Sequence, residues 1–249
     1  MEITSIKIRP LVPPGDDLFA ALRAIKRFRP KSGDIIAVSS KVVSIHEGRC
    51  VPLGSAMKDD LAKREAELFL ERKYVPNRFA LHTITRGVLI RNAGIDESNA
   101  NGHYVLWPKD PMVSARKIRA FLKKEYRLKQ VGVIITDSTS TPLRRGAMGF
   151  ALGFAGFEPL HDYRGTKDIF GRAFVAEMAN LADGLAAAAV LSMGEGSEQT
   201  PIAIIRNAPQ TVWKDHVSGK SRPDFIVPLS DDIFSPFFVS AKWKRGGSK

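Results

Sequence analysis

Short apolar runs bounded by turn residues recur along the chain, and this pattern predicts a series of strands. The clearest of them is an almost uninterrupted apolar run that ends in Asp137. Two further runs flank Arg86-Gly87 and predict a hairpin. The predicted strands cover Met1–Pro10, Ile35–Val38, Phe79–Thr85, Val88–Arg91, Gly132–Asp137 and Pro201–Ile205.

Apolar residues at helical spacing predict four helices between these strands. One of them, after an N-cap at Ser114, carries apolar residues on one face and a run of basic residues on the other. The predicted helices cover Asp16–Phe28, Lys58–Lys73, Ala115–Leu128 and Phe174–Leu191.

The remaining segments give weaker patterns. Gly149, Gly153 and Gly156 are spaced four and three residues apart, which favours a helix or strand packed closely against other backbone. Phe225–Leu229 and Phe237–Val239 are candidates for edge strands or dimer contacts, and Lys242–Lys249 for a mobile basic tail. Because no linker-like change in composition divides the chain, we expect one domain over residues 1–249.

Composition narrows the class of protein. The 249 residues are 44% hydrophobic and 26% charged, which is typical of a globular, soluble protein. No apolar run approaches the roughly 18 to 20 residues of a membrane span, and the N-terminus has no signal-peptide pattern. The single cysteine, Cys50, excludes an internal disulfide and fits a reducing compartment. We therefore expect a cytoplasmic protein without a membrane partner.

The net charge of +12 indicates an anionic ligand. Such a field attracts nucleic acid, nucleotides and small molecules with phosphates or several carboxylates. A non-catalytic RNA-binding protein is one alternative, and the basic helix face at Arg116–Lys124 motivates it. No aromatic-interleaved RNA-binding signature is present, and acidic turns at the ends of the core strands would repel phosphate. Nucleic acid is therefore the less favoured partner.

Three acidic turns follow predicted core elements. Asp96 lies in Asn92–Asn99, where Gly94 permits a tight bend after a strand; Asp137 and Ser138 end another strand; and Glu195 follows the last predicted helix. Each turn alone is explained by Asx turns that bond their own backbone. Brought to one locus, the three carboxylates would bind one or two divalent ions on a nucleoside triphosphate.

Basic and hydroxyl side chains complete the candidate chemistry. Ser39-Ser40-Lys41 follows a predicted strand and offers hydroxyls, backbone donors and a cation to a phosphate, although an ordinary polar strand end has the same composition. Arg164, Lys167 and Arg172 are candidates to neutralise phosphates or substrate carboxylates. The glycine-spaced region matches neither a P-loop nor a dinucleotide fingerprint.

Several motifs occur in an order that resembles the coenzyme F-420:L-glutamate ligase family, whose members are gamma-glutamyl ligases acting on a deazaflavin precursor. The resemblance also covers Pro10–Val12, Gly33–Gly48 and Pro201–Arg206, and so spans roughly residues 5 to 210, leaving residues 211–249 as a C-terminal extension. The motifs are NAGIDESN at Asn92–Asn99, ITDS at Ile135–Ser138, DYRG at Asp162–Gly165, DIFGR at Asp168–Arg172, ADGLAAA at Ala182–Ala188, and Met193-Gly194-Glu195.

The resemblance implies an α+β, mixed-sheet fold forming an intertwined homodimer, and a GTP-dependent amide ligase that uses two Mg²⁺ or Mn²⁺ ions, with K⁺ a further candidate. L-glutamate and a small anionic carboxylate acceptor would be its substrates. By motif, the metal ligands would be Asp96, Asp137, Ser138 and Glu195. The nucleotide would contact Pro10, Leu11, Val12, Ser39, Ser40, Lys41, Asn99, Met193, Gly194 and Gly196.

Two departures from the family pattern bear on specificity. Ile45 stands where the family commonly has a nucleotide-contacting lysine, for which Lys41 is a substitute from another direction. Ser140-Thr141-Pro142-Leu143-Arg144 replaces the usual Gly-Arg-Pro-Trp/Phe-Arg after the metal-binding aspartate. This segment adjoins the expected reaction centre, so a folate or other pterin-like acceptor, or a protein carboxylate, stays open beside the deazaflavin.

Overall fold

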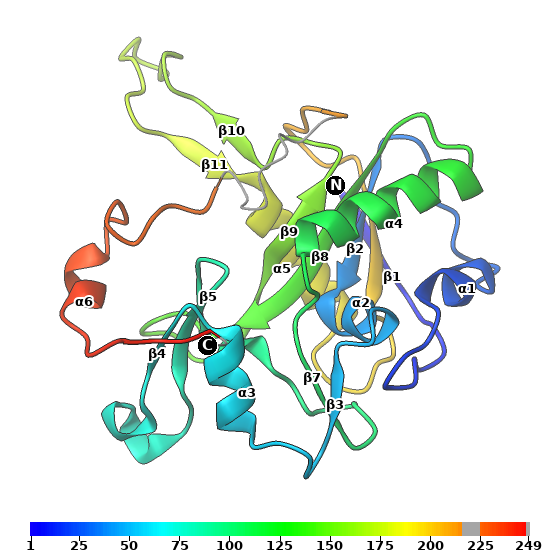
Figure 1. Cartoon of the computed structure of the whole chain (residues 1–249). Helices are drawn as coiled ribbons and strands as arrows, with labels where there is room; N and C mark the ends of the chain where they lie inside the picture. The colour runs from blue at the N-terminus through cyan, green and yellow to red at the C-terminus, as the bar shows by residue number, and fades with distance from the viewer. Residues whose placement is uncertain (216–224, 248–249) are drawn as a thin grey trace.

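A five-stranded mixed sheet forms the centre of the protein in the computed structural model, which describes residues 1–215 and 225–247 (Figure 1). Its strand order is β1-β12-β2-β8-β9. β2 and β8 are parallel and the other neighbours are antiparallel. The strands are β1 (Glu2–Ile6), β12 (Ile202–Arg206), β2 (Asp34–Ser39), β8 (Val131–Thr139) and β9 (Met148–Ala155).

Helices cover both faces of this sheet, because alternate residues of each strand point to opposite sides. In β2, Ile36 and Val38 belong to the core on one face, while Ile35 and Ala37 belong to the core on the other. The first core receives α1 (Leu18–Arg23), α2 (Ser40–His46) and α4 (Pro111–Glu125), and the second receives α5 (Leu181–Met193).

A smaller antiparallel sheet, with the order β13-β4-β5-β6, lies beside the main one (Figure 1). The predicted hairpin is confirmed, since β5 and β6 pair across a turn in which Arg86 and Gly87 both have positive φ. The elements of this region are α3 (Lys58–Glu65), β4 (Leu68–Leu70), η1 (Arg72–Tyr74), η2 (Pro76–Arg78), β5 (His82–Thr85), β6 (Val88–Arg91), η3 (Asn92–Gly94) and β13 (Lys244–Arg245).

Two further strand pairs complete the fold. β3 (Cys50–Pro52) pairs with β7 (His103–Val105), and β10 (Leu160–Asp162) pairs with β11 (Met178–Asn180). The second pair is the base of an arm that extends away from the main sheet (Figure 1). This overall arrangement confirms the expected α+β, mixed-sheet class.

All four predicted helices have different ends in the structure, and the one expected over Asp16–Phe28 covers only Leu18–Arg23. The helix expected over Lys58–Lys73 stops at Glu65, because Leu68–Leu70 pairs with β5 instead. The helix expected over Phe174–Leu191 begins only at Leu181, where Asn180 caps it by accepting from the backbone N of Asp183 at 3.0 Å. Asp110, rather than Ser114, caps α4.

Ser39-Ser40-Lys41 was interpreted as a strand end, either phosphate-binding or simply polar, and no helix was predicted there, but Ser40–His46 forms α2. This helix buries Val42, Val43 and Ile45 against the main sheet, which outweighs the strand preference of its β-branched residues. Close packing at the spaced glycines is confirmed, in a strand: a side chain at Gly149 would overlap Val190, and one at Gly153 would overlap Pro111.

Neither of the two C-terminal candidates for an edge strand forms one, and the alternative that they make dimer contacts stays a prediction. Phe237–Val239 lies in α6 (Ser235–Val239), and no strand forms over Phe225–Leu229. Within the expected mobile tail, Lys244–Arg245 pairs with β4 as β13, since that edge of the smaller sheet has backbone groups to satisfy. Residues 248 and 249 of that tail lie outside the described residues. No helix in the described part of the chain is long and apolar enough to cross a membrane.

Candidate functional site

A pocket of about 650 Å³ opens at the carboxyl ends of β2 and β8. Because these two strands are parallel, with Ser39 in register with Thr136, their ends reach the same edge of the sheet. This arrangement brings Ser40 and Lys41, which begin α2, next to Asp137 and Ser138 near the end of β8.

Two other segments close the pocket. The chain leaving β1 is held to the loop after α5 by a hydrogen bond from the Ile8 backbone N to Gln199 O at 3.0 Å. Asn99 reaches the same loop, its side-chain amide donating to Gly196 O at 3.0 Å. Every residue predicted to bind nucleotide or metal lines this pocket: Pro10, Leu11, Val12, Ser39, Ser40, Lys41, Asp96, Asn99, Asp137, Ser138, Met193, Gly194, Glu195 and Gly196.

The turn that carries Asp96 is strained and firmly anchored. Asn92, Ala93 and Gly94 all have positive φ, which is unfavourable for the buried Ala93. The Ala93 backbone N donates to Thr83 Oγ1 at 2.9 Å, and the Asn92 side chain accepts from Leu81 N at 3.0 Å. These two hydrogen bonds hold the turn against β5 and so fix the orientation of Asp96.

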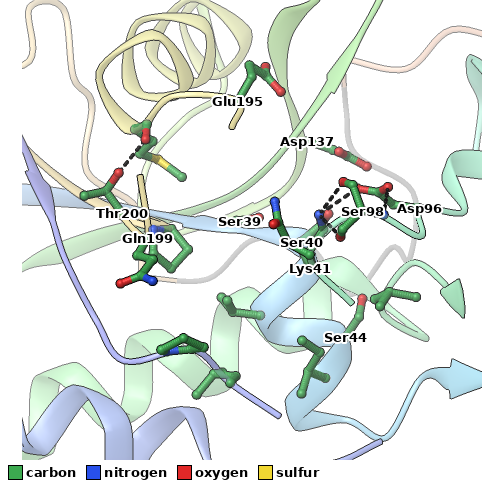
Figure 2. Close-up of a pocket in the computed structure, with 18 of the residues that line it drawn as sticks. Ser39, Ser40, Lys41, Ser44, Asp96, Ser98, Asp137, Glu195, Gln199 and Thr200 are labelled. Carbon is green, nitrogen blue, oxygen red and sulfur yellow. Dashed lines mark hydrogen bonds and ion pairs between the residues drawn. The ribbon is translucent and has the colours of Figure 1, made fainter. Parts of the chain in front are cut away.

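The Asp96 carboxylate is held as an anion. One oxygen accepts from the backbone N of Glu97 and Ser98, at 2.6 and 2.8 Å, and the other lies 2.7 Å from Lys41 Nζ (Figure 2). Burial by itself would raise the pKa of Asp96, but the Lys41 ammonium and these hydrogen bonds outweigh it and lower the pKa below its ordinary value. Lys41 therefore occupies the position of a counter-cation.

Asp137 is in the opposite electrostatic state. Its carboxyl accepts from the indole Nε1 of Trp107 and from the Ser138 backbone N, yet no cationic group pairs with it directly among the described residues. Burial raises the pKa of Asp137 to about 6, and the nearby Asp96 charge adds to the rise. A cation bound beside this carboxyl would remove the penalty of its ionised form.

Trp107 is the residue of this site that sequence reasoning missed. The sequence identified only a stiff loop around Pro108. The indole is buried and fills the space that the missing side chain of Gly94 leaves, because a Cβ at that glycine would overlap the ring. In the sequence, only the position of Trp107 beside Pro108, soon after the acidic turn, could have indicated a role at the site.

The oxygen atoms that could bind metal fall into two groups rather than one cluster. Ser138 Oγ donates to Glu195 Oε2 at 3.0 Å, while Asp96 and Asp137 lie near each other on the side of Lys41 (Figure 2). Over residues 1–215 and 225–247, no three His, Cys, Asp or Glu side chains come close enough together to hold one metal ion. Mg²⁺ is usually held by one or two carboxylates with water and phosphate oxygens, so these donors fit two such ions.

The predicted cationic residues Arg164, Lys167 and Arg172 do not line the pocket of their own chain. They lie on the arm between β10 and β11, which projects away from the main sheet (Figure 1). Arg164 instead pairs with Asp162, Nη2 to Oδ2, at 2.6 Å. The two-stranded arm carries them outward, and their role in neutralising phosphates or substrate carboxylates stays a prediction.

Comparison with known proteins places the chain in one family. The family described as F420-0:Gamma-glutamyl ligase matches residues 6–207. The chain is 33% identical to the coenzyme F420:L-glutamate ligase of Methanopyrus kandleri, over 94% of this chain and 97% of that protein. It is 35% identical to the protein of that name from Methanocaldococcus jannaschii, over 84% and 88% of the two chains. For Archaeoglobus fulgidus the identity is 36%, over 83% and 87%. The chain therefore belongs to the F420-0:gamma-glutamyl ligase family.

Proposed function

We propose that this protein is a GTP-dependent and metal-dependent ligase that joins the amine of L-glutamate to a carboxylate of a deazaflavin coenzyme F-420 precursor. The observation that carries the proposal is the meeting of Lys41, Asp96 and Asp137 on one wall of a pocket whose 650 Å³ suits a nucleotide. The family and the names of the relatives support the substrates.

The chemistry proceeds in two steps. An oxygen of the acceptor carboxylate attacks the γ-phosphorus of GTP, so an O–P bond forms, the β–γ bridge breaks and GDP leaves. The glutamate nitrogen then attacks the carbonyl carbon of the acyl phosphate; the C–N bond forms, the C–O bond breaks, and phosphate departs with the electron pair. The nitrogen's protons pass to phosphate and solvent. Both steps depend on positioning and charge neutralisation more than on a protein nucleophile.

The residues of the pocket supply that positioning. Asp96 and Asp137 would hold one Mg²⁺ or Mn²⁺ ion, and Ser138 with Glu195 a second; when bound, such ions neutralise the phosphate charge. The Lys41 ammonium is placed to move from Asp96 to a phosphate oxygen. The net charge of +12 draws anionic substrates toward the site. K⁺ is a further candidate ion.

We further propose that the protein acts as a homodimer. The arm between β10 and β11 exposes large apolar side chains, with Ile169 at 92% and Phe170 at 89% exposure. Apolar groups gathered at the end of a projecting arm favour burial against a partner. In such a dimer the arm would carry Arg164, Lys167 and Arg172 to the partner's substrates, which accounts for their distance from the pocket of their own chain.

The test is phosphate release from GTP with Mg²⁺ or Mn²⁺, L-glutamate and a panel of acceptors, with products identified by mass spectrometry. The panel contains the deazaflavin precursor, folates and peptides that end in a carboxylate, since Ser140–Arg144 departs from the family pattern. Release should require both glutamate and one acceptor, and Asp137→Asn should abolish it. The proposal fails if no acceptor elicits release and Asp137→Asn leaves nucleotide binding unchanged. An ATP control tests the preference for GTP.

A further inference from the structure

A second cavity, of about 450 Å³, lies against the same acidic wall as the nucleotide pocket. The two cavities share Gly94, Asp96, Asp137 and Ser138 in their linings. Apart from Thr139 of β8, the remaining lining of the second cavity comes from the smaller sheet and the segments around it, including Arg91 at the end of β6. A ligand in this cavity would therefore meet the ligand of the nucleotide pocket at the shared residues.

Arg91 is the group in this cavity that is poised to bind an anion. Its guanidinium lies 5.4 Å from the ring centre of Phe79 and has no hydrogen bond or ion pair with any residue of the described ranges. Arg72, in the same lining, differs: it donates to both Asp59 oxygens, at 2.7 and 2.8 Å, and to two backbone carbonyls. Arg72 is thus part of the wall, whereas the donors of Arg91 are free to form a bidentate pair with a carboxylate.

The cavity also presents charges of both signs near each other. Lys58 Nζ lies 3.5 Å from Glu97 Oε1, which is a loose ion pair that a ligand can rearrange. Toward the shared wall the charge becomes acidic, through Asp96 and Asp137. A polyanion such as a nucleotide is poorly matched to this distribution, whereas a zwitterion with carboxylates at one end and an amine at the other is well matched.

We propose that this second cavity is the binding site for the amino dicarboxylate substrate, L-glutamate. This inference rests on the proposed function. A glutamate carboxylate pairs with the Arg91 guanidinium, and the amine points to the shared wall of Asp96 and Asp137. The acyl phosphate would form in the nucleotide pocket beside the same shared residues, so the nitrogen reaches its carbonyl carbon where the two cavities meet. The volume, at the lower end of the usual range for ligand pockets, suits an amino acid.

The experiment compares Arg91→Gln with wild type in two measurements. In turnover, Arg91→Gln should raise the KM for L-glutamate about 10- to 100-fold, the usual effect of losing a hydrogen bond to a charged group, and leave the KM for GTP within about two-fold. Arg91→Lys, which keeps the positive charge, should recover part of the affinity for L-glutamate. Arg116→Gln, on the exposed basic face of α4, is the matched control and should change neither KM.

The second measurement is equilibrium binding of isotope-labelled L-glutamate to the protein with GDP and Mg²⁺, detected by NMR. Because it does not need turnover, it tests the assignment of the cavity separately from the proposed ligase function. If wild type ligates glutamate but Arg91→Gln binds it as tightly as wild type does, the cavity assignment is wrong and the proposed function stands. If wild type neither binds nor ligates L-glutamate with any acceptor, both are wrong. Circular dichroism and a thermal melt of each variant exclude misfolding as the cause of a loss.

Discussion

The indole N–H of Trp107 donates a hydrogen bond to Oδ2 of Asp137, although 30 residues separate the two in sequence. Trp107 is buried, and its ring fills the space beside Gly94. One side chain therefore fixes the carboxyl at the end of β8 and also contacts the turn that carries Asp96. The distance between the two acidic groups depends on this contact.

Trp107→Phe should weaken divalent-metal binding about 10- to 100-fold, the usual cost of losing an outer partner of a metal ligand. The phenyl ring keeps most of the packing and removes the N–H donor, so Asp137 loses one of its two hydrogen bonds. Titration of Mn²⁺ followed by electron paramagnetic resonance, with GDP present, measures the effect. Unchanged Mn²⁺ affinity would show that Asp137 needs no help from the indole.

Gly94→Ala should abolish activity and destabilise the fold, because the new methyl overlaps the Trp107 ring at a residue whose φ is +73°. Gly102→Ala is a closely matched control, since Gly102 has a φ of +77° and nothing within 4 Å of an added Cβ. Both variants carry the cost of a left-handed alanine, about 1 kcal/mol, and only Gly94→Ala displaces the indole. Thermal melts and phosphate release should separate the two; equal losses in both would contradict the role given to the contact.

Asp137→Asn should stabilise the metal-free protein at pH 7.5. Burial raises the pKa of Asp137 to about 6 in the folded state, whereas an unfolded chain has an Asp pKa of about 3.9. Ionisation of Asp137 therefore lowers the free energy of unfolding as the pH rises from about 4 to 6. Above pH 6 the loss amounts to about 1 to 3 kcal/mol. Asparagine removes the charge and still accepts from Trp107. Urea unfolding at pH 7.5 and pH 5 checks the sign: the gain should shrink at the lower pH, and a gain that grows there would refute it.

Lys41→Met should have opposite effects on the two ligands of the site. It removes the cation 2.7 Å from Asp96 and so frees that carboxylate, which should tighten Mn²⁺ binding in the absence of nucleotide. It also removes a cation from the phosphate site, which should weaken GTP binding about 10-fold or more. Lys41→Arg keeps the charge and serves as the control. Calorimetric titrations of Mn²⁺ alone and of GTP with Mg²⁺ give both affinities; a parallel loss of both would mean that Lys41 only maintains the pocket.

Phe170→Ser should weaken dimerisation, because the exposed ring at the end of the arm loses its apolar surface. Light scattering after size-exclusion chromatography, over a range of protein concentrations, measures the monomer fraction. Leu53→Ser removes an apolar side chain that is 46% exposed, next to β3 and away from the arm (Figure 1), and should leave the dimer intact. A monomeric wild-type protein with full activity would overturn the proposed dimer.

Local pattern was sufficient to predict the strands that form the core of the main sheet. The run that ends at Asp137 is almost entirely apolar, so burial on both faces follows directly from it, and the observed strand is longer, Val131–Thr139. The helix α2 was not predictable in this way, because Val42 and Val43 favour a strand and become helical only through packing on the sheet.

The sequence predicted which acidic residues belong to the site, but not the contacts between them and the rest of the chain. Acidic residues at element ends, and the motifs that carry them, identified Asp96, Asp137 and Glu195 as lining one pocket. Trp107 belongs to no periodic pattern of apolar residues, and nothing in the sequence around it indicates a contact with Asp137. For Arg164, charge in a sequence gives no distance, and the path of the β10–β11 arm places it away from the pocket of its own chain.

The chain that follows β1 forms one wall of the pocket, and its position depends on the pairing of β1 in the main sheet. β1 is an edge strand paired only with β12, within the described residues, and it leads directly into Pro10–Val12. Detachment of this first strand would remove a wall of the pocket while leaving the other four strands of the sheet paired. Nucleotide binding should therefore stabilise the pairing of β1 with β12. The amide hydrogens of Glu2–Ile6 should then exchange more slowly with solvent once GTP is bound.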